Sequence, residues 1–155
     1  MAELISVNPY FPEPWLMGQA AEILRKGGVA VIPTDTVYSI VCSVERKNAG
    51  ETLYRLKGPA GSAAGKPLSV IFSDLSGVSA YTRGLPNMAF KSMKRALPGP
   101  FTFILTASKR IPSAALQGRK TIGVRIPAHP VTQELLRQLD TPLLCTSVYH
   151  FPGDD

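Results

Sequence analysis

The sequence GVAVIPTDTVYSIVC, residues 28–42, contains two short apolar runs separated by a polar turn. Residues 29–32 are small or β-branched and too few for a helix, so they predict a buried strand that ends at Pro33. Residues 37–42 predict a second extended segment, and Thr34-Asp35-Thr36 lies between the two. The pattern therefore predicts two consecutive strands joined through polar side chains.

Helices and strands alternate on both sides of this segment. Helices are predicted over residues 15–26, 46–57, 86–97 and 131–139, where apolar residues recur at helical spacing. Gly27-Gly28 suits a helix C-cap, and Asp74 is placed to cap a further short helix. Strands are predicted over residues 67–72, 101–105, 122–126 and 143–146. The alternation predicts a layered α/β sheet.

Length and composition fit one globular domain. The chain has 155 residues, 45% of them hydrophobic and 18% charged, which is enough to bury a continuous core. No apolar run approaches the roughly 18 residues that span a bilayer, and the N-terminal segment lacks the order of a secretory signal. We expect a cytoplasmic protein that does not bind membranes. The alternative is location in an organelle such as a chloroplast or mitochondrion, after removal of a transit peptide.

The cysteines and histidines do not form a metal site in the sequence. Cys42 and Cys145 lie in apolar surroundings and are too few for a disulfide framework, so both are interpreted as small core residues. His129 and His150 are not at metal-ligand spacing from each other or from a cysteine. We expect no tightly bound transition metal.

The positive charge is concentrated in one part of the chain. The formal net charge is +6, and residues 75–133 contain no aspartate or glutamate. The basic residues of that stretch are Arg83, Lys91, Lys94, Arg95, Lys109, Arg110, Arg119, Lys120 and Arg125. Such a region attracts phosphates by local field and counterion release. The alternative is a basic surface that serves only solubility.

Three polar clusters follow or interrupt the predicted strands. They are residues 33–38, the small-residue loop between Lys57 and Lys66, and Thr146-Ser147. Ligands of α/β sheets bind where such loops meet, although the loop is equally interpreted as a disordered surface segment. The sequence contains no arguable catalytic triad, P-loop or dinucleotide motif. Any chemistry would then depend on positioning and electrostatics.

Four blocks carry a family resemblance: GGVAVIPTDTVYSIVC at residues 27–42, PGPFTFIL at 98–105, TIGVRIPAHP at 121–130 and PLLCTS at 142–147. In this order and at these separations they resemble the YrdC-like family. The resemblance implies a YrdC-like (RibB-like) α/β fold, with a single-domain twisted mixed sheet flanked by helices and a positively charged concave cavity. Segments such as SDLSGVSAY, residues 73–81, are more similar to the YciO branch.

The resemblance also implies an activity. The best known one in the family is synthesis of L-threonylcarbamoyladenylate from ATP, L-threonine and bicarbonate, with release of pyrophosphate, for the threonylcarbamoyladenosine modification of tRNA. ATP would bind with Mg²⁺, and tRNA or double-stranded RNA is an implied partner. The alternatives are a non-catalytic RNA-binding module and a different carbamoyl-adenylate reaction, as in hydrogenase-maturation carbamoyltransferases.

The family pattern assigns roles to individual residues. Lys57 and Arg125 would be catalytic through contacts to phosphates or a carboxylate. The substrate and nucleotide pocket would be lined by Thr34, Thr36, Tyr38, Lys66, Thr102, Thr146 and Ser147, and RNA would contact Lys91, Lys94, Arg95, Arg119 and Lys120. Ordinary structural roles are the alternatives: turn and core residues for Thr36 and Tyr38, a strand residue for Thr102, and an ion-pair partner for Arg125.

The sequence departs from the family pattern inside its motifs. Gly58-Pro59 follows Lys57 where the pattern has an arginine, Ser39 stands at a glycine position, and Tyr149 replaces the asparagine of the closing motif. Family members usually extend beyond that motif, so we expect residues 1–155 to be a single YrdC-like domain that lacks its C-terminal part.

Overall fold

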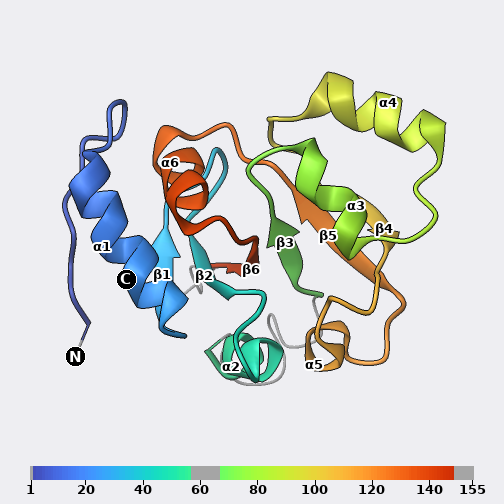
Figure 1. Ribbon diagram of the computed structural model, residues 1–155, viewed down its shortest axis with the longest axis horizontal. Helices are drawn as coiled ribbons and strands as arrows, with labels where there is room; N and C mark the ends of the chain where they lie inside the picture. Colours follow the sequence, from blue (N-terminus) through green and yellow to red (C-terminus); the bar gives the residue numbers. More distant parts are fainter. Residues whose placement is uncertain (1, 57–66, 149–155) are drawn as a thin grey trace, which may run out of the picture.

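A computed structural model describes residues 2–56 and 67–148 (Figure 1). The predictions for Lys57, Lys66 and the loop between them lie outside these residues, as does Tyr149. None of the helices in the described part of the chain is long and apolar enough to cross a lipid bilayer.

Six strands form one open mixed sheet. They are β1 (Val29–Ile32), β2 (Ser39–Ser43), β3 (Ser69–Ile71), β4 (Phe103–Thr106), β5 (Thr121–Arg125) and β6 (Leu143–Ser147). Their order across the sheet is β1-β2-β6-β3-β5-β4. Only β3 and β5 run parallel, and the other neighbours are antiparallel. The predicted mixed sheet is confirmed, and β1 has the bounds predicted from its four apolar residues.

Helices flank the sheet. They are α1 (Pro14–Arg25), α2 (Ala49–Leu56), α3 (Val78–Tyr81), α4 (Asn87–Ala96), α5 (Ser113–Leu116) and α6 (Pro130–Leu139), with a 3-10 turn η1 (Leu75–Gly77) before α3. Four were predicted within a few residues, and the short helix predicted after Asp74 corresponds to η1 and α3, whereas the single-turn α5 was not predicted. Gly27, which follows the C-cap residue Lys26, has the φ of +88° expected of a glycine that ends a helix, and the Asp74 carboxylate accepts from the Ser76 amide.

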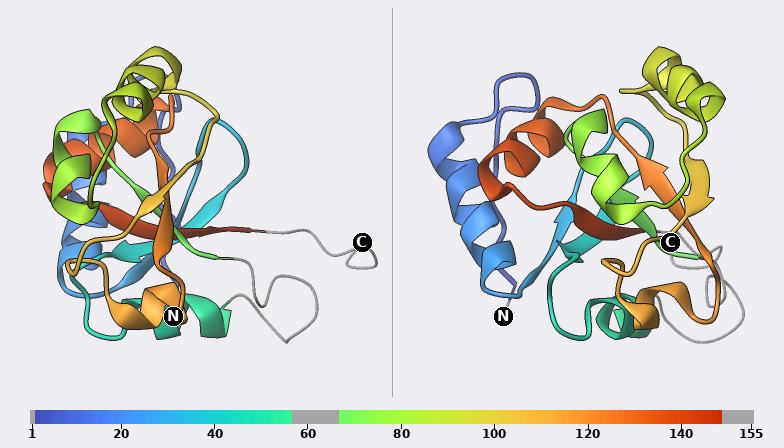
Figure 2. Two further views of the ribbon diagram at one scale, coloured as in Figure 1. Left: turned by 90° about the vertical axis from the view of Figure 1, so that its right-hand side faces the viewer. Right: turned by 45° about the vertical axis from the view of Figure 1, so that its right-hand side comes forward.

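Two apolar clusters hold the helices to opposite faces of the sheet. Register places Ala30, Val41 and Cys145 on one face, in the cluster formed with α1 and α6. The other face carries Cys42 and Leu144, in the cluster that includes side chains from α2, α3, α4 and α5. Figures 1 and 2 show α1 and α6 side by side over the β1 end of the sheet. Both cysteines are buried core residues, as predicted.

The face that carries α1 and α6 changes character towards β4. The row that begins with Ala30 and Val41 continues through Cys145 to Ser69, Gly123 and Ile104. Ser69 is only half-buried and Ile104 is 62% exposed. Among the described residues, α1 and α6 therefore cover only the β1 side of this face, and its β4 side is open, with small residues at Ser69 and Gly123 and the exposed Ile104 on β4.

Candidate functional site

The turn between β1 and β2 takes its shape from Thr34. The Thr34 hydroxyl donates to the Val37 carbonyl over 2.7 Å and accepts from the Thr36 amide over 3.2 Å. Such local side-chain bonds are the usual means by which threonine fixes a turn. Thr34 is itself buried, whereas Thr36 is exposed. Thr34 thus fixes the turn conformation that presents Thr36.

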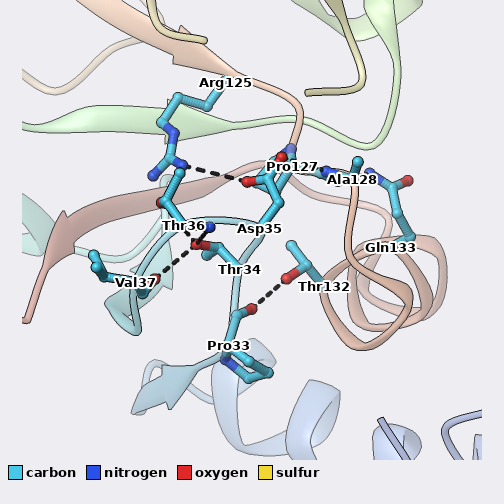
Figure 3. Close-up of polar contacts among 10 residues, drawn as sticks. All are labelled: Pro33, Thr34, Asp35, Thr36, Val37, Arg125, Pro127, Ala128, Thr132 and Gln133. Carbon is cyan, nitrogen blue, oxygen red and sulfur yellow. Dashed lines mark hydrogen bonds and ion pairs between the residues drawn. The ribbon is translucent and has the colours of Figure 1, made fainter. Parts of the chain in front are cut away.

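Arg125, the last residue of β5, reaches this turn across the sheet (Figure 3). Its Nη2 atom donates to Thr36 Oγ1 over 3.0 Å and lies 3.6 Å from Asp35 Oδ1. Asp35 Oδ2 accepts from the Ala128 amide over 2.9 Å, in the loop after β5. Arg125 is only 7% exposed, and the Asp35 carboxylate is its ion-pair partner. A buried cation needs such a partner.

The helix α6 holds the other side of the turn. The Thr132 hydroxyl, in the first turn of α6, donates to the Pro33 carbonyl over 2.6 Å. Gln133 Nε2 donates to the Pro127 carbonyl over 2.8 Å, which fixes the loop between β5 and α6. The turn is therefore fastened to β5 and to α6 at once, and a rigid scaffold of this kind suits ligand positioning.

Cys145 lies beside the Arg125 guanidinium on the same face. Burial raises the pKa of the Cys145 thiol to about 12, and the neighbouring Arg125 cation opposes part of that rise. Burial likewise raises the pKa of Cys42 to about 11. Both thiols are therefore protonated at neutral pH and unsuited to nucleophilic chemistry.

Gly123 forms the floor of the open part of this face. A Cβ atom at Gly123 would lie 2.5 Å from Ser69 Oγ and 2.9 Å from Thr102 Cγ2. Ser69 of β3 and Thr102, the residue before β4, thus lean over the glycine from either side, and only a residue without a side chain fits between them. The predicted site residue Thr102 is exposed at this floor.

Thr146 and Ser147, predicted together for the pocket, point to opposite faces of β6 because strand residues alternate. Ser147 is opposite Ser39 in the register and shares the face of Arg125. Thr146, 5% exposed, is opposite Ile40 on the other face. Only Ser147 of this pair belongs to the open face.

The remaining predicted residues lie farther out. Tyr38 is 59% exposed directly before β2, and its carbonyl accepts from the Val148 amide over 2.8 Å. The proposed RNA-contacting residues form two separate groups: Lys91, Lys94 and Arg95 on α4, and Arg119 and Lys120 before β5. The chain enters β4 beside the C-terminal half of β5, so the groups lie towards opposite ends of this strand pair (Figure 1).

The structure thus brings Thr34, Thr36 and Arg125 together and adds three residues to which the sequence assigned no individual role in the site. Asp35 pairs with Arg125, and Ser69 and Gly123 form the floor. Gly123 carried a usable signal, because an isolated glycine within a strand marks close approach of another group. The pairing of Asp35 depends on the fold of the turn, and the sequence held no comparable signal for it.

Two depressions occur elsewhere on the surface. One of about 730 Å³ lies between the segment at Tyr10 and α6, and a second of about 330 Å³ adjoins Tyr81 and Arg110. Two of the acids in these walls already have partners, since Asp74 accepts from Ser76 and Glu134 accepts from Arg137, and Asp140 lines both depressions. Neither contains a residue predicted for the site. The open face at Arg125 is the better candidate because polar groups from distant segments converge there.

The described residues do not build a metal centre. Within residues 2–56 and 67–148, no group of three or more His, Cys, Asp or Glu side chains is placed to hold an ion.

Comparison with known proteins agrees with this geometry. The family model for Sua5, YciO and YrdC, described as "Telomere recombination", matches residues 22–152. YciO of Escherichia coli, an uncharacterised protein, is 41% identical over 156 residues, covering 100% of this chain and 73% of that protein. Its crystal structure superposes with a TM-score of 0.85, covering 99% of this chain and 73% of that one.

Relatives with a named activity match as well. Threonylcarbamoyl-AMP synthase of Thiobacillus denitrificans is 36% identical over 124 residues, covering 80% of this chain and 64% of the synthase. Sua5 of Pyrococcus abyssi, crystallised with L-threonine, is 28% identical with a TM-score of 0.84, covering 94% of this chain and 42% of that one. With its YciO and Sua5 relatives and the same arrangement of sheet and helices, the chain belongs to the Sua5/YciO/YrdC family.

Proposed function

We propose that this protein is an L-threonylcarbamoyladenylate synthase-like nucleotidyltransferase. It would condense ATP, L-threonine and bicarbonate to threonylcarbamoyl-AMP and pyrophosphate, as a step towards threonylcarbamoyladenosine in tRNA. The proposal is supported by relatives named as threonylcarbamoyl-AMP synthases and by the Sua5 structure with L-threonine. The observation that carries it here is the largely buried Arg125 guanidinium, held beside the exposed Thr36 on the face whose β4 side is open.

The reaction needs positioning and charge stabilisation more than a protein nucleophile. Threonine and bicarbonate first give a carbamate with loss of water, and a carbamate oxygen then attacks the α-phosphorus of ATP. The bond from that phosphorus to the bridging oxygen breaks, and pyrophosphate leaves with the electron pair. Preformed donors placed where negative charge develops lower such a barrier most.

The chain's own groups would share this work. Arg125 would anchor a carboxylate or phosphate, because a guanidinium presents planar donors that match either group. Thr36 and Ser147 would supply hydroxyl donors. The small residues Ser69 and Gly123 would leave room for a flat or bulky ligand at the floor of the site. Mg²⁺ would enter as part of the ATP substrate and neutralise the departing pyrophosphate. The positively charged cavity implied by the resemblance is part of this proposal.

The test is release of pyrophosphate by the purified protein. Release should require ATP, L-threonine and bicarbonate together, and labelled bicarbonate should appear in an adenylate-containing product. Omission of each substrate in turn is the control for contaminating ATPase activity. Normal ATP binding without any product in the complete mixture would overturn the synthase assignment.

A second function is favoured by α4. This helix buries only Met93, while Lys91, Lys94 and Arg95 are exposed on it. It lies within the stretch that contains no acidic residue, so no aspartate or glutamate of α4 or its flanking loops offsets these charges. Cations in this arrangement suit contacts to the phosphates of structured RNA, recognised through backbone and shape.

RNA binding of this kind predicts a steep dependence on salt. A tRNA mobility-shift series from 50 to 300 mM salt should show affinity falling linearly on logarithmic axes. A complex that is equally stable at both ends of the series would exclude the phosphate-contact explanation.

A further inference from the structure

The hydroxyl of Ser39 is buried and makes no hydrogen bond within the described part of the chain. Ser39 is the first residue of β2 and 0% exposed. A buried polar group in this state lowers stability relative to a smaller residue, so its presence calls for an explanation.

Register supplies a neighbour for that hydroxyl. Ser39 is paired with Ser147 across β2 and β6, so both side chains lie on the face that carries Arg125. Opposed residues of antiparallel strands hold their Cβ atoms about 4.5–5.5 Å apart. Rotation about the Cα–Cβ bonds is then enough to bring two serine hydroxyls into hydrogen-bonding distance.

The two serines differ in their access to a ligand. Ser147 is half-buried, whereas Ser39 is enclosed and cannot contact a ligand itself. Each hydroxyl has one proton and two acceptor lone pairs. When Ser39 donates to Ser147 Oγ, the Ser147 proton is directed elsewhere, and the open side of the face is where an anionic oxygen would accept it.

We infer that Ser39 is a positioning residue for Ser147, orienting its hydroxyl as a donor to an anionic ligand on the open face. The inference rests on the proposed function for the identity of that ligand. In this pairing the Ser147 hydroxyl is a donor directed by an internal hydrogen bond.

The first test needs no ligand. Urea unfolding of wild type, Ser39→Ala, Ser147→Ala and the double variant forms a cycle that measures the coupling of the two hydroxyls. Ser43→Ala is the matched control, because Ser43 lies on the same strand and face but bonds the Glu45 amide. We expect the shifts in urea midpoint to be non-additive for the Ser39 and Ser147 substitutions. The shifts should be additive for the Ser43 and Ser147 substitutions. Additivity in both cycles would overturn the inference.

The second test titrates ATP into the same proteins by calorimetry. Ser39→Ala and Ser147→Ala should each weaken ATP binding about five-fold, the loss of one hydrogen bond, and the double variant should be no weaker than the single ones. Ser43→Ala should bind as wild type does. A Ser147→Ala defect without a Ser39→Ala defect would refute the positioning role and leave the proposed function standing. A wild-type protein that binds no ATP would refute the proposed function. The unfolding cycle would still decide whether the Ser39 and Ser147 hydroxyls interact.

Discussion

Arg125 and Thr36 are 89 positions apart in the sequence, and the Nη2 atom of the arginine donates to the threonine hydroxyl over 3.0 Å. The same nitrogen lies 3.6 Å from Asp35. One side chain thus links the end of β5 to the turn before β2. Its charge serves the fold through Asp35, and its position on the open face suits the binding of an anion.

Replacement of Arg125 should damage stability and binding together. Arg125→Ala leaves the largely buried Asp35 carboxylate without its cation, which should lower the free energy of unfolding by about 3 kcal/mol. Arg125→Lys keeps the charge without the planar fork, so it should recover part of the stability but little of the ATP affinity. Urea unfolding and calorimetry measure the two effects.

The control for this prediction is Arg137→Ala. Arg137 is exposed and bonds Glu134 on the same helix, so its loss should leave the free energy of unfolding nearly unchanged. If Arg125→Ala and Arg137→Ala lowered the free energy of unfolding equally, the buried ion pair of Arg125 would contribute no more than an exposed one.

Gly123→Ala should fill the floor of the site. The new methyl group would lie 2.5 Å from Ser69 Oγ and 2.9 Å from Thr102 Cγ2, so these side chains must move, at a cost of about 1–3 kcal/mol. ATP and L-threonine binding should weaken beyond the effect on stability, which titration at a temperature well below unfolding can show. Gly18→Ala is the control, because its methyl group would meet only the flexible end of Gln138, and a helical alanine favours stability. Unaltered binding by Gly123→Ala would place the ligand elsewhere.

The two buried thiols predict a loss of stability in alkali. The folded pKa of Cys145 is raised to about 12 from the usual 9.0, and that of Cys42 to about 11. Above pH 9 the unfolded chain releases these protons and the folded chain keeps them, so their contribution is fully present below pH 9 and declines as the pH rises. Above pH 9, each thiol should lower the free energy of unfolding by about 1.4 kcal/mol for every pH unit.

Urea unfolding between pH 7.5 and 10.5 can isolate this effect. Cys145→Ala should lose stability less steeply above pH 9 than wild type does, whatever its stability at pH 7.5. Parallel curves for the two proteins would contradict the assignment of the alkaline loss to Cys145.

The basic residues of α4 should account for part of any RNA affinity. Replacing Lys91, Lys94 and Arg95 by alanine should reduce the magnitude of the logarithmic salt slope by about 2–3, one unit for each lost phosphate contact. A control triple, Arg25, Lys26 and Arg137 to alanine, removes the same charge from α1, its C-cap and α6. If both triples lower the slope equally, RNA responds to net charge and not to α4.

Most of the sheet was predictable because its strands are short apolar runs bounded by proline, glycine or polar residues. The helix α5 was not, because four residues are too few to show a helical period. The site was predictable only in part. Thr36 and Arg125 were recognised from the family resemblance, but the separation of Thr146 from Ser147 follows from the face that each occupies, which the register alone reveals.

The position of β6 has a consequence for how the protein is made. This strand is the last of the described chain to be synthesised, yet it lies between β2 and β3 in the middle of the sheet. Until residues 143–147 leave the ribosome, the hairpin of β1 and β2 and the unit of β3, β4 and β5 each present an unpaired inner edge to the cell. Nascent chains of this protein therefore complete their folding late and expose strand edges that invite aggregation, so their yield should depend on chaperones during translation.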